Sequence, residues 1–201
     1  MKKKYLLLIV AFVAFGFSIK AQSFNGGVLG GVSGTQISGD DLSGFNKGGL
    51  YIGAFVNRYF GDKSSLQMEL DFIQKGSRKN PNAKKNDYST YLLRLNYIEI
   101  PVSYKYDFSA KGTLEGGLSL GVLVNSYEEA NETTTVSGGE FNRTDFSFHV
   151  GGYYTIVENL RINVRYSSSI LPVRDHSSGA TDRLNAGQYN SVLSFILFYG
   201  F

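Results

Sequence analysis

Apolar and polar residues alternate with a period of two along most of the chain beyond residue 22. In the segment Ser65–Lys75, the apolar side chains of Leu66, Met68, Leu70 and Phe72 share one face, and polar side chains occupy the other. Four further segments alternate in the same way: Thr113–Asn125, Phe146–Thr155, Leu160–Ser167 and Val192–Phe201. Because successive side chains of a strand point to opposite faces, each segment is predicted to be a strand with one apolar face.

Three other segments complete a set of eight predicted strands. Phe24–Ile37 is rich in glycine, and Gly48–Phe60 is apolar on both faces. Leu92–Asp107 is long, and its polar positions change face near Tyr97, which predicts a β-bulge or a change of environment. Pro101 lies within this segment and has no N–H to donate, so we expect an irregularity in the strand pairing there.

The connections between these strands alternate between short and long. The short ones are Gly61–Ser64, Asp107–Gly112 and Val157–Asn159. The long ones are Ser38–Lys47, Ser77–Ser89, Glu128–Asn142 and Pro172–Gly187. Outer-membrane barrels have short periplasmic turns and longer extracellular loops. The sequence therefore predicts an all-β fold, an eight-stranded antiparallel up-and-down transmembrane β-barrel with both termini in the periplasm.

The first residues have the pattern of a secretory leader. Lys2, Lys3 and Lys4 precede an apolar run, Tyr5–Ile19, of about 15 residues, which is short for a membrane-spanning helix. We expect cleavage after Ala21, which gives a signal peptide at 1–21 and a barrel domain at 22–201. An uncleaved inner-membrane anchor is the alternative interpretation of the same segment.

A soluble barrel that carries a ligand would show the same alternation with its faces inverted. Three features favour the membrane version and a location in the bacterial outer membrane. The polar faces are rich in glycine and serine with charges of both signs, and the chain ends in a strand whose last residue is Phe201. Tyrosines lie near several strand ends, where an interfacial girdle is expected: Tyr59, Tyr104, Tyr106, Tyr127, Tyr153, Tyr154 and Tyr166.

Composition excludes several kinds of chemistry. The chain has no cysteine, which rules out zinc–thiolate sites and thiol nucleophiles. The formal net charge of +3 is small and dispersed, so nucleic acid is not an expected partner. No motif indicates a cofactor or a metal, and we expect neither.

Several segments resemble one known family in order along the chain. They are LQMELDFIQKG (Leu66–Gly76), YIEIPVSYKYDF (Tyr97–Phe108), GLSLGVLVNSY (Gly117–Tyr127), ENLRINVRYSSSI (Glu158–Ile170) and the ending LSFILFYGF. Together they resemble the PorT-like outer-membrane β-barrel family of the Bacteroidetes. The resemblance implies an eight-stranded barrel in the outer membrane, and it supplies no catalytic residues to carry over.

The alternation places a set of charged and titratable residues inside the predicted barrel. They are Glu69, Asp71, Glu99, Lys105, Glu115, His149, Arg161 and Arg165. An eight-stranded barrel is just wide enough for side chains to fill it, and buried charges must be paired. We interpret the set as a structural network in the lumen. The alternative is a narrow polar path for ions or small solutes.

An enzymatic interpretation rests on one strand. Asp145, Ser147 and His149 share a face at period-two spacing, but a catalytic triad is defined by geometry rather than by spacing in sequence. Such co-facing residues arise by chance in a serine-rich strand. We therefore predict that the protein is not an enzyme and has no catalytic residues.

The predicted loops carry opposite charges. Basic residues cluster around the second long loop: Lys75, Arg78, Lys79, Lys84 and Lys85. Acidic residues cluster around the third: Glu128, Glu129, Glu132 and Glu140. These loops are interpreted as solvated surfaces. The functional alternative is contact with anionic surface glycolipid, such as lipopolysaccharide, or docking of a protein partner.

The leading hypothesis is a non-enzymatic outer-membrane barrel with a structural or interaction role, which displays its four extracellular loops. Outer-membrane lipid is its expected surrounding partner. A narrow small-solute channel and a soluble ligand-carrying periplasmic barrel are the alternatives.

Overall fold

The computed structural model describes residues 24–40, 42, 44–131, 133–134, 140–175 and 187–201. The predicted signal peptide, residues 1–21, lies outside this part of the chain. Among the described residues, no helix is both long and apolar enough to cross a membrane.

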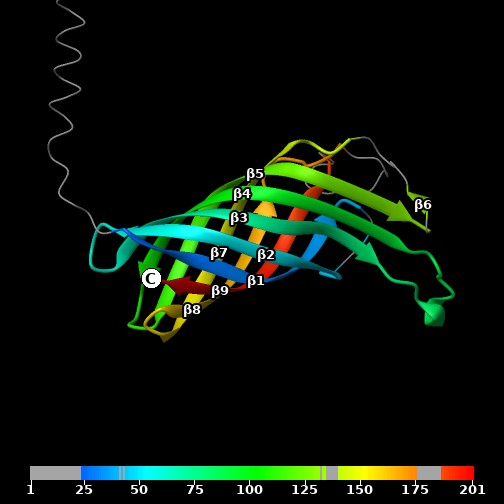
Figure 1. Cartoon of the computed structure of the whole chain (residues 1–201). Helices are drawn as coiled ribbons and strands as arrows, with labels where there is room; N and C mark the ends of the chain where they lie inside the picture. Colours follow the sequence, from blue (N-terminus) through cyan, green and yellow to red (C-terminus); the bar gives the residue numbers. More distant parts are fainter. Residues whose placement is uncertain (1–23, 41, 43, 132, 135–139, 176–186) are drawn as a thin grey trace, which may run out of the picture.

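Eight long antiparallel strands close into a barrel within the described residues (Figure 1). They are β1 (Asn25–Ser38), β2 (Lys47–Tyr59), β3 (Ser64–Lys79), β4 (Tyr91–Asp107), β5 (Gly112–Ala130), β7 (Thr144–Val157), β8 (Leu160–Ser169) and β9 (Tyr189–Gly200). Each pairs with the next along the chain, and β1 pairs with β9 to close the sheet. The short β6 (Thr133–Thr134) pairs with the end of β5, and a 3-10 turn, η2 (Ala83–Lys85), lies between β3 and β4. The predicted up-and-down topology is confirmed.

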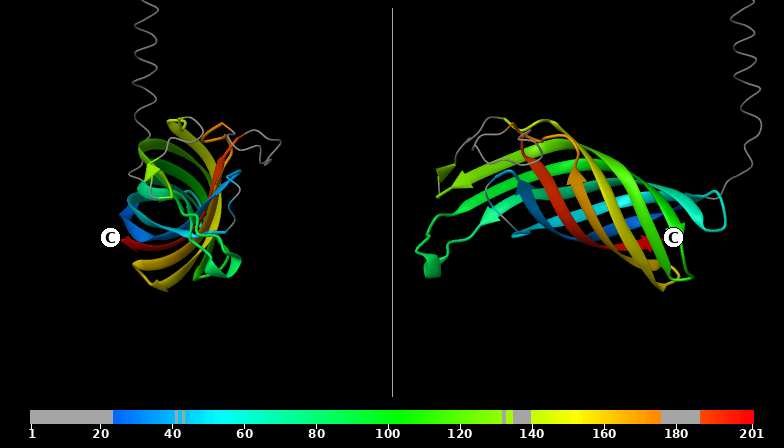
Figure 2. Two further views of the ribbon diagram at one scale, coloured as in Figure 1. Left: turned by 90° about the vertical axis from the view of Figure 1, so that its right-hand side faces the viewer. Right: turned by 180° about the vertical axis from the view of Figure 1, so that it is seen from behind.

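Short turns gather at one end of the barrel, next to the start of β1 and the C-terminus, and the longer connections lie at the other end (Figure 2). In outer-membrane barrels the short-turn end is periplasmic. At the extracellular end, β3, β4 and β5 project beyond their neighbours (Figure 1). Two of these strands are longer than predicted, so Arg78, Lys79, Glu128 and Glu129 lie on strands and not in loops.

The two faces of the barrel wall have opposite polarity. On β3, Leu70 points outward and is 57% exposed, whereas its neighbours Glu69 and Asp71 point inward and are 2% and 1% exposed. A soluble ligand-carrying barrel would need an apolar interior and a polar exterior. The observed inversion shows that the soluble alternative is wrong.

Outward-facing tyrosines form part of the expected girdle. Tyr59 does not belong to it, because it lies on the inner face of β2 at the periplasmic mouth, where it lines a hollow with Asn57 and Arg161 and donates to Asp107 at 3.0 Å. Tyr104, Tyr106 and Tyr154 are exposed on the outer wall close to the short turns, where a membrane interface lies. Tyr153 was expected in the same girdle, and this is wrong. It is 4% exposed inside the barrel, and its ring packs edge-on against Phe198 at a centroid distance of 5.0 Å. Consecutive residues of a strand face opposite ways, so Tyr153 and Tyr154 do not share the outer surface.

Along β4 the polarity of both faces reverses on the extracellular side of Tyr97, as the sequence predicted. Ile98 and Ile100 face outward below this point, whereas above it Arg94 faces outward and Leu95 faces inward. The pairing of β4 with β5 shifts register at the same place, between Asn96 and Tyr97. The inner face of β4 above this point therefore joins an apolar core, which includes Ile37, Ile73, Leu93, Leu95 and Tyr97. The reversal marks the level at which the barrel leaves the membrane.

Pro101 interrupts the pairing of β3 with β4. Met68 pairs with Val102 and Asp71 with Glu99, but no pair forms at Pro101, although the register is the same on both sides. The predicted irregularity is therefore a local loss of ladder bonds, because proline has no N–H to give.

The depth of the apolar band predicts how a charge on the outer wall is tolerated. Leu120 lies near the middle of β5 and Leu114 near its periplasmic end, and both face outward. We expect Leu120→Arg to lower the free energy of unfolding by about 2–4 kcal/mol and Leu114→Arg by less than about 1 kcal/mol. Guanidinium unfolding of the barrel in lipid vesicles, followed by gel mobility, measures both. Equal losses would contradict the assigned membrane level.

Candidate functional site

Arg165 on β8 lies at the centre of the lumen and bonds to two carboxylates from other strands. Its Nη1 and Nη2 donate to Glu69 on β3 at 2.9 and 2.8 Å. Its Nε and Nη2 donate to Glu115 on β5 at 2.8 and 2.9 Å. In the order of strands around the barrel, β3 lies opposite β8. The bidentate pair with Glu69 therefore ties opposite walls together, and the bidentate pair with Glu115 joins a third strand to the same guanidinium.

Neutral residues complete the coordination of this cluster. Tyr153 donates its hydroxyl to Glu115 at 2.8 Å, and Asn163 donates to the other oxygen of Glu115 at 2.9 Å. Tyr51 accepts from Arg165 at 3.1 Å. Gly151 makes room for this arrangement, since a Cβ there would lie 2.6 Å from the Glu115 carboxylate. The buried charges are thus both paired and hydrogen-bonded, which is the condition under which burial is tolerated.

A second cluster lies on the extracellular side of the first and is centred on Lys75. This residue ends the predicted strand Ser65–Lys75, and it was also counted with the basic residues around the second loop. It is 1% exposed inside the barrel, so the strand position is confirmed and the loop assignment is wrong. It forms ion pairs with Glu99 and, at 2.9 Å, with Asp145. Asn190 on β9 donates to the same Asp145 oxygen at 2.8 Å. Lys75 follows the period-two pattern of β3, which carries it inward.

A third cluster lies inside the extracellular mouth. Arg174, which follows β8, donates to Glu128 of β5 at 2.8 Å and to Gln188 at 3.0 Å. Tyr91 donates to Glu128 at 2.7 Å. Glu128 was expected on a solvated acidic loop, but the structure buries it with these partners. Glu132 from the same predicted cluster lies outside the described residues.

The other predicted lumen residues also lie on the inner face, with different kinds of partner. Asp71 accepts from Tyr51 at 2.9 Å, and Lys105 donates to Gln67 at 2.8 Å. His149 shares a hydrogen bond of 2.7 Å with Ser103. Arg161 is partly exposed at the periplasmic rim, 5.9 Å from the Phe55 ring and 5.5 Å from the Tyr153 ring.

The geometry does not join Asp145, Ser147 and His149 into a triad. His149 bonds to Ser103, and Asp145 bonds to Lys75 and Asn190. Within the described part of the chain, no group of three or more His, Cys, Asp or Glu side chains is placed to hold a metal ion.

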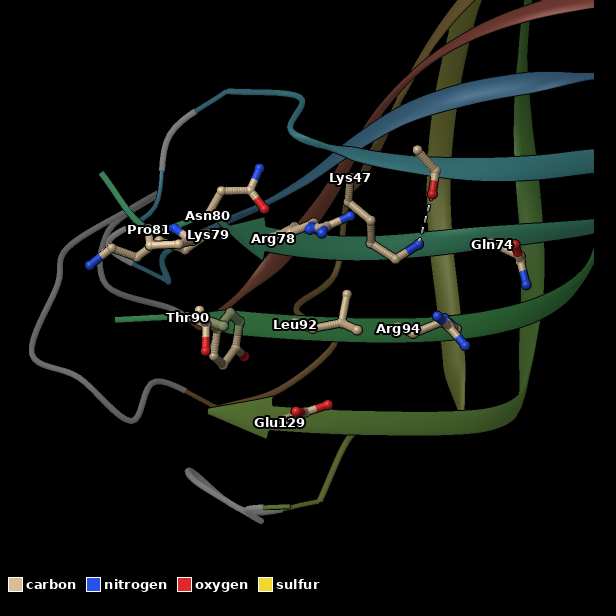
Figure 3. Close-up of a pocket in the computed structure, with 12 residues that line it drawn as sticks. Lys47, Gln74, Arg78, Lys79, Asn80, Pro81, Thr90, Leu92, Arg94 and Glu129 are labelled. Atoms are coloured by element: carbon tan, nitrogen blue, oxygen red, sulfur yellow. Dashed lines mark hydrogen bonds between the residues drawn. The ribbon is translucent and has the colours of Figure 1, made fainter. Parts of the chain in front are cut away.

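A hollow of about 600 Å³ lies at the extracellular ends of β2, β3, β4 and β5 (Figure 3). Figure 3 shows that its cations come from neighbouring strands, Lys47 from β2, Arg78 from β3 and Arg94 from β4. Lys79 also lines it, and Glu129 is the one carboxylate in its described lining. The hollow therefore has a strong excess of positive charge.

Lys47 is held tightly in this hollow, beyond the apolar membrane band. Its ammonium donates to the carbonyl of Gly48 at 3.5 Å, and it is 4% exposed. Gly76, at a φ of +132°, leaves space for the Lys47 stem, since a Cβ there would lie 3.1 Å from Lys47 Cδ. Arg94 is close enough to Lys47 to interact with it electrostatically, so two like charges face the same hollow.

Lys79 differs from the other cations because it has a carboxylate partner. It forms an ion pair of 2.9 Å with Asp87 in the β3–β4 connection, and Ser89 also donates to Asp87. Hydrogen bonds from Lys79 and Ser89 hold the pKa of Asp87 well below its usual range. This pair stabilises the connection rather than offering a free cation to the hollow.

The hollow contains residues that the loop-charge pattern missed. Arg78 and Lys79 were predicted in a basic cluster, whereas Lys47 and Arg94 were not. The sequence signal for Arg94 was the change of polarity near Tyr97, because it indicates that Arg94 lies beyond the membrane band and faces water. Lys47 carried no such signal, because only the pairing of the strands brings it beside Arg94.

Comparisons with known proteins agree with this architecture. The model of a family described as outer membrane protein beta-barrel domain matches residues 20–174. The solved structure of Neisserial surface protein A is similar at a TM-score of 0.55 and 14% identity, covering 89% of this chain and 97% of that chain. The attachment invasion locus protein Ail of Yersinia pestis is similar at a TM-score of 0.51 and 11% identity, covering 88% of this chain and 98% of that chain.

Ail has also been solved in complex with the heparin analogue sucrose octasulfate, and that structure matches at a TM-score of 0.52 and 10% identity over 89% of this chain and 99% of that chain. At these identities the likeness shows the fold. No curated protein matches the chain by sequence.

The Arg165 cluster predicts a large and specific loss of stability. Arg165→Met leaves Glu69 and Glu115 buried without a cation, so we expect the free energy of unfolding to fall by about 3–5 kcal/mol. Arg161→Met is the matched control, and it should cost less than about 1 kcal/mol because Arg161 is partly exposed at the rim. Guanidinium unfolding in lipid vesicles measures both.

A compensating variant tests the reason for that loss. Glu69→Gln and Glu115→Gln, added to Arg165→Met, remove the uncompensated charges and should restore most of the lost stability. If the triple variant were no more stable than Arg165→Met alone, the stabilising role assigned to charge pairing would be wrong.

Proposed function

The chain belongs to the outer membrane protein beta-barrel domain family, and we propose that this bacterial outer-membrane barrel is a non-enzymatic interaction protein that acts through its extracellular strand ends and loops. The proposal rests on one observation: Arg165 on β8 and Glu69 on β3, from opposite walls of the barrel, bond to each other inside the lumen. A barrel whose interior is occupied in this way offers its surfaces, and not its interior, to other molecules.

The three ionic clusters support a lumen without a solute path. Arg165, Lys75 and Arg174 follow one another from the middle of the barrel to its extracellular mouth, and each is paired with carboxylates from other strands. A selectivity filter needs charges that a passing ion can replace or approach. These carboxylates are already engaged by protein cations, which favours the structural interpretation of the network over the channel alternative.

The extracellular end has the features of an interaction surface. The projecting strands β3, β4 and β5 carry a polar outer face above the membrane level, and basic residues gather on β2, β3 and β4. We expect outer-membrane lipid, including lipopolysaccharide, and protein partners at the loops to be the molecules it contacts.

Within its family, we place the chain with the PorT-like barrels of the Bacteroidetes. The ordered likeness of Leu66–Gly76, Tyr97–Phe108 and Glu158–Ile170 supports this assignment. It adds no catalytic role, and it is consistent with a barrel that acts by contact.

Conductance separates the interaction protein from a channel. The full mature chain, reconstituted in a planar bilayer, should give no discrete conductance steps, because side chains from opposite walls meet in the lumen. A general porin measured in the same bilayer is the positive control, and a heat-dependent shift in gel mobility verifies that the barrel is folded. Discrete steps whose size changes in Arg165→Ala would overturn the proposal and establish the channel alternative.

A further inference from the structure

The basic hollow lies directly above the apolar band of the barrel wall. Leu50 and Ile98 are exposed on the outer wall on the membrane side of it. Gln74 and Arg94 line the hollow itself, on the strands that continue upward from this band. The hollow therefore lies just beyond the apolar band, at the level expected for lipid headgroups.

The cations of the hollow lie close enough to one another for their positive charges to repel. Arg94 pairs across the β3–β4 ladder with Gly76, two residues before Arg78, so the two arginines are diagonal neighbours. Such neighbours lie about 7–8 Å apart, and like charges at short range are destabilising. Within the described residues, neither Arg78 nor Arg94 forms an ion pair. Lys79 of the same hollow is paired with Asp87, so Lys47, Arg78 and Arg94 are the cations that favour a bound anion there.

We propose that this hollow binds the phosphorylated headgroup of an outer-leaflet glycolipid of the lipid A type. Arg78 and Arg94 would bind phosphate through paired N–H donors, and Lys47 would add a point charge from β2. The inference deepens the proposed function, on which it rests, by naming the partner and the site of one contact.

The surroundings of the hollow favour a lipid over a soluble polyanion. An amphiphile that places its phosphates among Lys47, Arg78 and Arg94 can lay its acyl chains on the exposed wall formed by Leu50 and Ile98. Burial of this apolar surface adds to the ionic contacts. A soluble polyanion gains only the ionic contacts, which physiological salt screens.

The hollow is also preorganised, because its cations stand on paired strands. Lys47 is the first residue of β2 and pairs with Thr35, while Arg78 and Arg94 belong to the β3–β4 ladder. The Thr35 hydroxyl donates to the carbonyls of Lys47 and Gly76, at 3.3 and 2.9 Å, and so joins β2 to β3 beneath the hollow. A binding surface held in this way loses less conformational entropy on binding than a loop would.

Lipid binding to the full mature barrel tests the proposal. The barrel is placed in nanodiscs of neutral phospholipid, and diphosphorylated lipid A is titrated in while the lipid bound per barrel is counted by native mass spectrometry. We expect Arg78→Gln/Arg94→Gln to weaken binding at least about tenfold relative to the unaltered barrel. The double variant Lys84→Gln/Arg143→Gln removes two exposed cations of the same extracellular end outside the hollow, and it should bind as the unaltered barrel does.

A second variant adds an anion without removing a native side chain. Gly48 lines the hollow, and a Cβ built on it meets no atom within 4 Å, so Gly48→Glu should fold normally. It should weaken lipid A binding by a similar factor, because a carboxylate then occupies the place of the phosphate. The heat-dependent gel shift verifies that each variant is folded.

The remaining outcomes decide between ligand sources. Equal binding by the unaltered barrel and both hollow variants would overturn the proposal. Binding of soluble heparin that depends on Arg78 and Arg94, without such dependence for lipid A, would overturn it in favour of a soluble polyanion. Inorganic phosphate should compete only weakly, since it lacks acyl chains. Neither result alters the conductance of the lumen, so failure here is distinguishable from failure of the proposed function.

Discussion

The rest of the barrel depends on one buried guanidinium that is shared between two carboxylates. Arg165 joins β8 to β3 across the lumen and to β5, which lies two strands away, so three strands are fixed at one point in space. The outer face of the surrounding wall contacts lipid and must be apolar. Because side chains alternate along each strand, the polar residues then point into the lumen. A narrow polar interior is stable only if its charges are matched, and the matching determines which side chains the lumen can hold.

The fold was largely predictable from the sequence because one rule acts on every residue of a barrel strand. Alternation, the spacing of turns and the change of face at Tyr97 each indicated a feature that the structure has. Errors arose where the rule was set aside: Tyr59 and Tyr153 were assigned to the girdle, and Lys75 was counted with a loop, although their positions along the strand point inward. The projecting lengths of β3 and β5 were missed because polar residues there resemble loops.

The inward position of the eight predicted residues followed from period two, but their partners did not. Whether Arg165 contacts Glu69 depends on the relative positions of β3 and β8 along the barrel axis. Closure of the whole barrel sets these positions, and the sequence of neither strand reveals them. The basic hollow was harder still, because Lys47 and Arg94 are 47 residues apart and become neighbours only through the pairing of β2, β3 and β4.

The change of polarity near Tyr97 fits the outer surface of the barrel to two environments, the hydrocarbon layer of the membrane and the water beyond it. The hairpin of β3 and β4 carries Arg78, Lys79, Lys84 and Arg94 on the far side of the apolar band from the periplasm. Every one of these charges must pass through or around the hydrocarbon layer before the barrel closes, and charge at that depth is costly. The charges of the finished surface therefore raise the free-energy cost of moving this hairpin across the membrane during biogenesis. A locally thinned bilayer would lower that cost.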